Sequence, residues 1–158
     1  MVYPSQFNLG SIPATATISS AYLNLYNAVN LHSYDVESRY TISTTYLRRV
    51  TESWDESTIT WNDQPATTTT NQVSLDAPLS GSDDFTDINV TPIINDMLNE
   101  GNYGFLLRLQ TEYKYRHVIF ASSDYAYAAD RPMLSITCTA MQKSFYQPGG
   151  RSTRLTTG

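Results

Sequence analysis

The sequence predicts an all-β fold, an antiparallel jelly-roll-like β-sandwich with one short helix, on three observations. The composition favours strands, because the chain has twelve tyrosines and only 16% charged residues, and aromatic and β-branched side chains fit a pleated surface. Several short stretches alternate apolar and polar residues between turn-forming residues, whereas a single stretch has helical spacing. Periodicity alone does not separate a jelly roll from a closed barrel.

Six stretches have the pattern expected of strands. They are residues 21–26, 39–50, 84–90, 105–110, 118–121 and 133–139. The side chains expected to share one face are Ala21, Leu23 and Leu25 in the first, Tyr40, Ile42, Thr44, Tyr46 and Arg48 in the second, Thr86, Ile88 and Val90 in the third, and Phe105, Leu107 and Leu109 in the fourth. The polar stretches 27–34 and 67–71 are expected to be loops.

One short helix is expected at about Thr91–Asn99. Thr91 is suited to the N-cap, and Pro92 follows at the first helical position, where its missing N–H costs nothing. Apolar residues then recur at helical spacing, and Gly101 follows at the C′ position. The apolar residues are Ile93, Ile94, Met97 and Leu98.

The length of 158 residues suits one domain with a core that needs no disulfide or structural metal. We expect the β-sandwich to occupy residues 1–140. Residues 141–158 are polar and carry three basic side chains, so they are expected to form a tail, either a linker or a segment that docks on this chain or on another. No internal repeat is present.

Composition excludes several classes of protein. The net charge of −5 argues against a nucleic-acid binder, which normally gathers Lys and Arg on one face. No apolar run reaches the roughly 18 residues of a membrane span, and the first residues lack the pattern of a signal peptide. One cysteine and two histidines exclude an internal disulfide and argue against a Cys/His zinc cluster. No G-x-S-x-G elbow supports a serine hydrolase.

The densest cluster of chemically active residues lies within residues 50–65. Trp54 and Trp61 frame three carboxylates, Glu52, Asp55 and Glu56. A catalytic interpretation makes two of the carboxylates the acid and base that flank a sugar on one tryptophan. The alternative, which we favour, makes Trp61 a core anchor and the acids turn caps or surface partners, because paired glycosidase carboxylates usually come from separate strands.

A second cluster, residues 111–117, predicts a ligand-binding surface. Tyr113 and Tyr115 share a face if this stretch is a strand, and Arg116 and His117 lie beside them. Aromatic faces stack on sugar rings, and arginine pairs with sugar carboxylates. The candidate contacts are therefore Tyr113, Tyr115, Arg116 and His117, with Arg48 and Arg108 as charge partners. The alternative is a polar hairpin with ordinary surface tyrosines.

Two further features concern charge. Asp83, Asp84 and Asp87 offer oxygen ligands that Ca²⁺ prefers, although adjacent aspartates at a strand start are also common in solvated turns. No other cofactor is expected. In the pair Arg48–Arg49, strand alternation directs one side chain outward and buries at most the stem of the other.

Four stretches resemble a known family. They are residues 7–26, the run 50–65 with T-E-S-W-D-E and T-W-N, residues 88–107 around the helix, and residues 120–134 with Phe120-Ala-Ser-Ser-Asp-Tyr125 and Arg131-Pro-Met-Leu134. In this order they resemble the DNRLRE domain, also classed as carbohydrate-binding module family 96 and related to disaggregatase repeats. Its structural motif residues match Trp54, Trp61, Pro65, Arg131 and Pro132.

The resemblance implies a noncatalytic jelly roll from secreted or surface-attached proteins, with alginate-like acidic glycans as ligands of some members. Family domains usually have one or two strands before the Phe7 strand, and the acidic-basic motif that names the family is absent from this sequence. We therefore expect a neighbouring chain, or the tail, to complete an edge by strand donation.

Two functions follow as hypotheses. The first is a noncatalytic extracellular or cell-surface module that binds polysaccharide. The second is a structural subunit of a surface fibre or adhesive assembly, joined to neighbouring copies by strand pairing or tail donation, with no sugar ligand. The first requires exposed aromatic side chains on one face, and the second requires a strand edge or groove that a partner segment fills.

Overall fold

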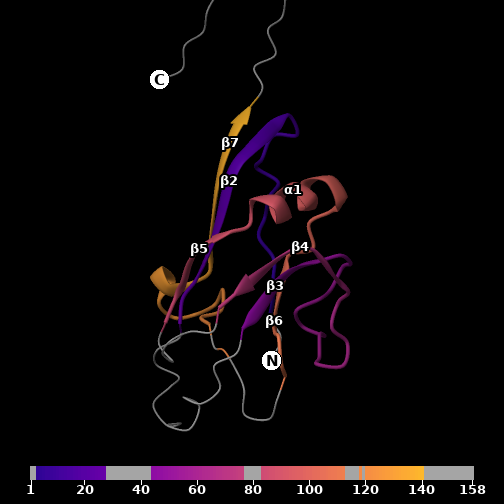
Figure 1. Ribbon diagram of the computed structural model, residues 1–158, viewed down its shortest axis with the longest axis vertical. Coiled ribbons are helices and arrows are strands. Elements are labelled where there is room, and N and C mark those ends of the chain that lie inside the picture. The colour runs from indigo at the N-terminus through magenta and orange to yellow at the C-terminus, as the bar shows by residue number, and fades with distance from the viewer. Residues whose placement is uncertain (1–2, 28–43, 77–82, 113–117, 119, 141–158) are drawn as a thin grey trace, which may run out of the picture.

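In the computed structural model, which describes residues 3–27, 44–76, 83–112, 118 and 120–140, two antiparallel sheets face each other (Figure 1). One sheet has the strand order β1-β6-β3-β4 and the other β5-β2-β7. The elements are β1 (Tyr3–Ser5), β2 (Ala16–Leu25), β3 (Thr45–Val50), β4 (Thr67–Leu75), β5 (Phe85–Asn89), α1 (Thr91–Glu100), β6 (Phe105–Leu109), the 3₁₀ turn Ala128–Asp130 and β7 (Met133–Ala140). The all-β sandwich with one short α-helix is therefore confirmed.

The core lies between the two sheets and is closed by α1. Alternate residues of each central strand point inward, so that Leu23 of β2, Leu47 of β3 and Leu107 of β6 belong to one buried cluster. Ile93 and Ile94 of α1 add to this cluster and are fully buried. The inward faces predicted for residues 21–26 and 105–110 are thus confirmed, because period-2 alternation there reports which side faces the core.

The start of α1 differs from the prediction. Val90, not Thr91, is the N-cap residue, and Thr91 is already helical. The Thr91 hydroxyl instead accepts the Ala21 N–H at 2.8 Å, which ties α1 to β2. The Oδ1 of Asn89 accepts the Thr91 N–H at 3.1 Å. Gly101 ends the helix with a φ of 111°, and no helix in the described residues is long and apolar enough to cross a membrane.

Two strand predictions are wrong. Residues 67–71, expected to be a loop, begin β4, which pairs with β3 from Thr67↔Val50 to Leu75↔Thr45. Threonine suits such a strand although its side chain is polar. Backbone pairing holds the threonine half of β4, whereas Val73 and Leu75 at its other end contact the core. Within residues 118–121 the described part forms only a single bridge, Asn27↔Phe120, instead of a core strand. Residues 28–43, which include most of the expected loop 27–34 and the start of the expected strand 39–50, lie outside the described residues.

A bulge in β5 changes the face of Thr86. Asp87 has a φ of 56°, and the pairing with β2 shifts between Leu23↔Ile88 and Leu25↔Phe85. Ile88 remains buried and Thr86 is exposed. The expectation that Thr86 shares a face with Ile88 is therefore wrong, because an extra residue reverses the alternation.

Arg49 is buried as a whole, not only by its stem. Its side chain is 5% exposed, and its Nη2 pairs with Glu100 Oε2 of α1 at 2.5 Å. Its Nε is buried and has no hydrogen-bond partner among the residues that the structure describes. The prediction that at most the aliphatic stem of one arginine is buried is wrong. Glu100, the last residue of α1, supplies a carboxylate to the buried guanidinium, and sequence spacing does not reveal this contact.

We expect Glu100→Ala to lower the free energy of unfolding by about 1–2 kcal/mol, because it leaves a buried guanidinium without its carboxylate. Arg49→Met removes the charge but keeps the packed stem, so it should cost less than Glu100→Ala. Urea unfolding of the two variants checks this order. If Glu100→Ala lowered the free energy of unfolding less than Arg49→Met, the ion pair would not be what offsets the burial of the Arg49 charge.

Candidate functional site

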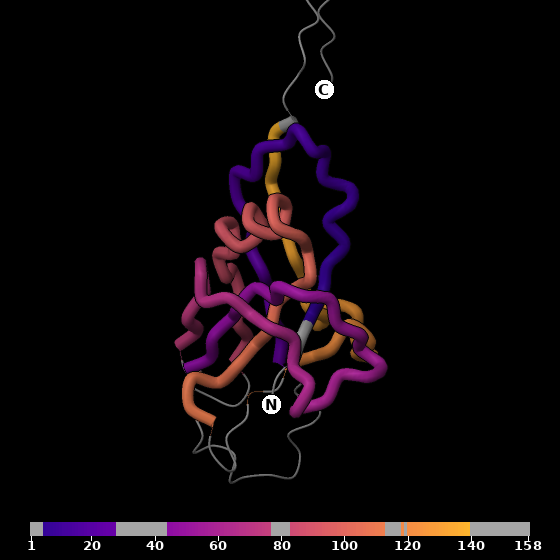
Figure 2. The backbone as a smooth tube through the Cα atoms, turned by 90° about the vertical axis from the view of Figure 1, so that its right-hand side faces the viewer, coloured from indigo at the N-terminus to yellow at the C-terminus, as the bar shows by residue number. Residues whose placement is uncertain are grey.

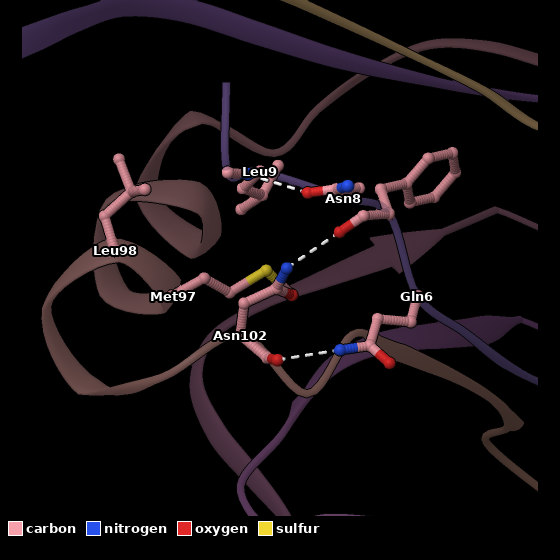
Figure 3. A pocket seen from close by; sticks show the side chains of 8 residues that line it. Gln6, Asn8, Leu9, Met97, Leu98 and Asn102 are labelled. Atoms are coloured by element: carbon pink, nitrogen blue, oxygen red, sulfur yellow. Dashed lines mark hydrogen bonds between the residues drawn. The ribbon is translucent and has the colours of Figure 1, made fainter. Parts of the chain in front are cut away.

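The N-terminal segment lies against the turn between α1 and β6. Asn102 donates from Nδ2 to the Phe7 carbonyl at 2.7 Å, and its own carbonyl accepts from Gln6 Nε2 at 2.9 Å (Figure 3). Together with Met97 and Leu98 these residues line an open cavity of about 500 Å³. The side-chain amides of Gln6 and Asn102 already hydrogen-bond to the backbone and hold the N-terminal segment in place. The N–H groups used in these bonds are therefore not free for a ligand in this cavity.

Gly104 allows the closest backbone approach in this region. Its φ is 88°, and a Cβ at this position would lie 2.3 Å from the Ser5 carbonyl oxygen. Its own carbonyl accepts the Val50 N–H at 2.9 Å. A residue with a side chain cannot occupy this place without displacing the end of β1.

A group of basic and aromatic side chains lies on the outer face of the four-stranded sheet, and we call it the arginine face. It consists of Tyr46 and Arg48 of β3, Gln72 of β4 and Arg108 of β6. Tyr46 and Arg108 are directly opposite in the β3–β6 pairing, which places them on one side of the sheet. Leu47 faces the core. Its neighbours in the strand, Tyr46 and Arg48, therefore both point to the outer side of the sheet.

The arginine face is preorganised by its own contacts. The Arg48 guanidinium lies 5.3 Å from the centroid of the Tyr46 ring, a cation–π arrangement. Its Nε donates to Gln72 Oε1 at 2.8 Å. Arg108 is 47% exposed and pairs with Glu112 at 3.1 Å. Arg48 is half-buried and Arg108 is exposed, so Arg108 is the more accessible of the two guanidinium groups.

The structure thus brings together two of the six predicted contact residues, Arg48 and Arg108. The other four, Tyr113, Tyr115, Arg116 and His117, lie outside the described residues and stay a prediction. Tyr46 was not predicted as a contact, although its position two residues before Arg48 on the same strand face was the signal that could have found it.

The two tryptophans of residues 50–65 have opposite environments. Trp61 is 51% exposed, so the interpretation of Trp61 as a core anchor is wrong. Trp54 is half-buried, and its Nε1 donates to the Tyr103 carbonyl at 2.7 Å. A tryptophan hydrogen-bonded at its only polar atom is fixed in orientation, so Trp54 holds this loop and Trp61 does not. Pro65 is buried near the end of the same loop.

Two of the three carboxylates of this loop accept hydrogen bonds from the backbone of the loop. Glu52 accepts the Ala66 N–H at 2.7 Å. Asp55 accepts from the Ser57 hydroxyl at 2.6 Å and from the Ser57 N–H at 2.8 Å, and these bonds hold the pKa of Asp55 below its usual value. A general acid requires a raised pKa, so the turn-capping interpretation fits both residues.

The three aspartates proposed for Ca²⁺ do not converge. In the described part of the chain, no group of three His, Cys, Asp or Glu side chains could hold a metal ion. Asp84 instead accepts the Asn27 N–H at 2.8 Å, and Asp87 lies at the β5 bulge. Asp83 lies just before β5 and is half-buried.

The motif residues near β7 have structural contacts. Arg131 donates from Nε to the Tyr125 carbonyl at 2.9 Å and so closes the loop before β7. Pro132 is half-buried beside it. Among the described residues, the most exposed aromatic side chains, Trp61 and Tyr127, lie outside both the arginine face and the surroundings of Trp54.

Comparison with known proteins gives one match. The model of carbohydrate-binding module family 96 matches residues 5–138 of the chain. The matched region runs from the last residue of β1 into β7 and so contains α1 and nearly all of both sheets. No curated protein and no solved structure matches the chain.

We expect Gly104→Ala to lower the free energy of unfolding by more than about 1 kcal/mol, because φ is positive and the added Cβ meets the Ser5 backbone. Gly10→Ala is the matched control, since a Cβ there meets only the Asn8 side chain at 3.1 Å. Thermal unfolding of both variants checks this. Equal melting temperatures would contradict the close approach at Gly104.

Ser57→Ala should raise the pKa of Asp55 towards its usual value, because it removes the hydroxyl that donates to the carboxylate. A depressed folded-state pKa stabilises the fold above the unfolded-state pKa, and this contribution is lost as the pH falls through the folded-state value. The variant should therefore lose less stability on acidification. A carboxylate NMR titration measures the pKa directly, and an unchanged value would refute the Ser57 hydroxyl as the cause of the shift.

Proposed function

The chain belongs to carbohydrate-binding module family 96, a family of noncatalytic modules, and from this premise we propose that it binds an acidic polysaccharide outside the cell. The arginine face is the proposed binding surface. Its support is the position of Arg48 and Arg108 on adjacent strands, on the same side of the sheet, with the Tyr46 ring beside them.

The chemistry of this face suits a uronic-acid polymer. Guanidinium groups bind carboxylates through paired, charge-assisted hydrogen bonds. The Tyr46 ring offers an apolar surface to the C–H groups of a pyranose. The net charge of −5 would repel a polyanion over most of the surface, so binding requires a local concentration of arginines such as this one.

Residues 113–117 follow Glu112 directly in the sequence. Glu112 is the partner of Arg108, so the short segment that follows β6 lies beside the arginine face where the described residues end. We propose that Tyr113, Tyr115, Arg116 and His117 extend this surface. In this proposal Glu112 is a competitor of the ligand, because its carboxylate occupies Arg108 as a uronate would.

A structural subunit is the second candidate, and β7 supports it. In the described residues β7 pairs only with β2, so its other edge is open to a further strand. Beside it lies an open groove of about 340 Å³. One wall is formed by Leu134, Ile136 and Cys138 of β7, and the other by residues within 7–12. An added strand would satisfy the edge by β-augmentation. This candidate predicts concentration-dependent self-association, whereas the first predicts a sugar ligand.

We expect Arg48→Gln and Arg108→Gln each to weaken binding to oligomers of mannuronic and guluronic acid about tenfold, since each removes a charge-assisted hydrogen bond. Glu112→Gln should strengthen binding, because it releases Arg108. Isothermal titration with these oligomers measures all three variants.

The opposite signs exclude a general disruption of the surface as the cause, because disruption would weaken binding in all three variants. Weakening by Glu112→Gln, or unchanged affinity of both arginine variants, would contradict the arginine face. If no uronic oligomer binds and light scattering shows a mass that grows with protein concentration, the structural candidate replaces the first.

A further inference from the structure

A separate cavity of about 380 Å³ lies where three distant segments meet, and we call it the Trp54 pocket. It is lined by Ser5, Gln6, Phe7, Trp54, Glu56, Ser123 and Pro132. These residues come from the end of β1 and the segment after it, the loop after β3, and the loop before β7. The volume lies within the roughly 300–1,000 Å³ typical of small-molecule sites.

Trp54 and Phe7 give this pocket two aromatic walls, each fixed by the protein. The indole N–H of Trp54 is already used by the Tyr103 carbonyl, so only the ring remains for a ligand. Phe7 is held at its carbonyl by Asn102 and packs edge-on against Phe105 at 6.2 Å. Rigid aromatic side chains bind a ligand's apolar surface at little cost in conformational entropy.

The polar groups of the pocket are mainly acceptors. In the described residues the Glu56 carboxylate makes no hydrogen bond or ion pair, and it lines the pocket. Gln6 uses its Nε2 on the Asn102 carbonyl, which leaves its Oε1 to accept. The Ser123 hydroxyl can donate or accept. None of the lining residues is Lys, Arg or His.

This set of groups defines the ligand by charge. Glu56 repels a uronate or a sulfated sugar, and no lining residue supplies a cation to offset that repulsion. Sugar hydroxyls, in contrast, donate to a carboxylate in charge-assisted hydrogen bonds. Stacking on Trp54 requires the flat, apolar C–H face that a pyranose offers.

We infer that the Trp54 pocket binds an uncharged pyranose residue, stacked on Trp54 with a hydroxyl donating to Glu56. The inference uses the carbohydrate-binding character of the family but not the arginine face, with which the pocket shares no residue. In this inference the chain has two sugar-binding surfaces, one for acidic sugar units and one for uncharged units.

The two tryptophans of the chain make the test direct. Trp61→Phe leaves Trp54 as the single tryptophan fluorophore, and Trp54→Phe leaves Trp61. The probes are β-1,4-linked hexasaccharides of glucose, mannose and xylose, with an oligomer of mannuronic acid for comparison. We expect at least one neutral probe to change the fluorescence of the Trp61→Phe protein saturably, and none to change that of the Trp54→Phe protein.

Glu56→Ala, placed in the Trp61→Phe background, should weaken this binding about tenfold. It tests the pocket without touching the fold, because Glu56 is exposed and has no partner among the described residues. The double variant Arg48→Gln/Arg108→Gln in the same background should retain the neutral-sugar response, which separates this inference from the proposed acidic ligand.

Three results would overturn the inference. One is the absence of a saturable change in the Trp61→Phe protein with every neutral probe up to millimolar concentration. Another is an affinity that Glu56→Ala leaves unchanged. The third is tighter binding of the mannuronic oligomer than of the neutral probes at Trp54, which would make the pocket part of the acidic surface.

Discussion

The backbone approach at Gly104 is the constraint on which the neighbouring structure depends. Because Gly104 has no side chain, β1 can pair closely with β6, and the Gly104 carbonyl fixes the end of β3. The two residues before it hold Trp54 and the segment that begins at Gln6. That segment forms a wall of both cavities that Trp54 and Met97 line, so the shape of either depends on three consecutive residues. The backbone of the N-terminal part of the chain can be followed in indigo in Figure 2.

The elements that were predicted correctly are those whose burial is one-sided. In β2 and α1 the apolar residues recur with the period of the element, so the sequence reports the face that meets the core. In β6 the alternation is incomplete, because Leu106, between Phe105 and Leu107, is also buried. β4 was missed because its threonines carry no such pattern and its order comes from pairing with β3. The direction of Thr86 was wrong because a backbone φ at Asp87, not a side chain, sets the bulge.

The sequence identifies several residues of the candidate surfaces, but it does not show which of them lie side by side in the fold. Arg48 and Arg108 were identified by charge, yet they lie 60 positions apart, and only the β3–β6 register places them on one face. The two tryptophans have similar sequence surroundings, and the difference between them is a hydrogen bond to Tyr103, which is remote in sequence. Contacts that join distant segments leave no local pattern from which they can be derived.

Arg49 and Arg108 differ in exposure, so ionic strength should affect their interactions differently. The Arg49 guanidinium is shielded inside the protein, whereas Arg108 is 47% exposed. Mobile ions screen charges in solvent beyond about 8 Å at physiological ionic strength, and they act much less on buried pairs. If the arginine face binds an acidic ligand as proposed, a rise in ionic strength should weaken that binding more than it weakens the fold. If the Trp54 pocket binds a neutral sugar as inferred, that affinity should change little with ionic strength, because the ligand has no net charge.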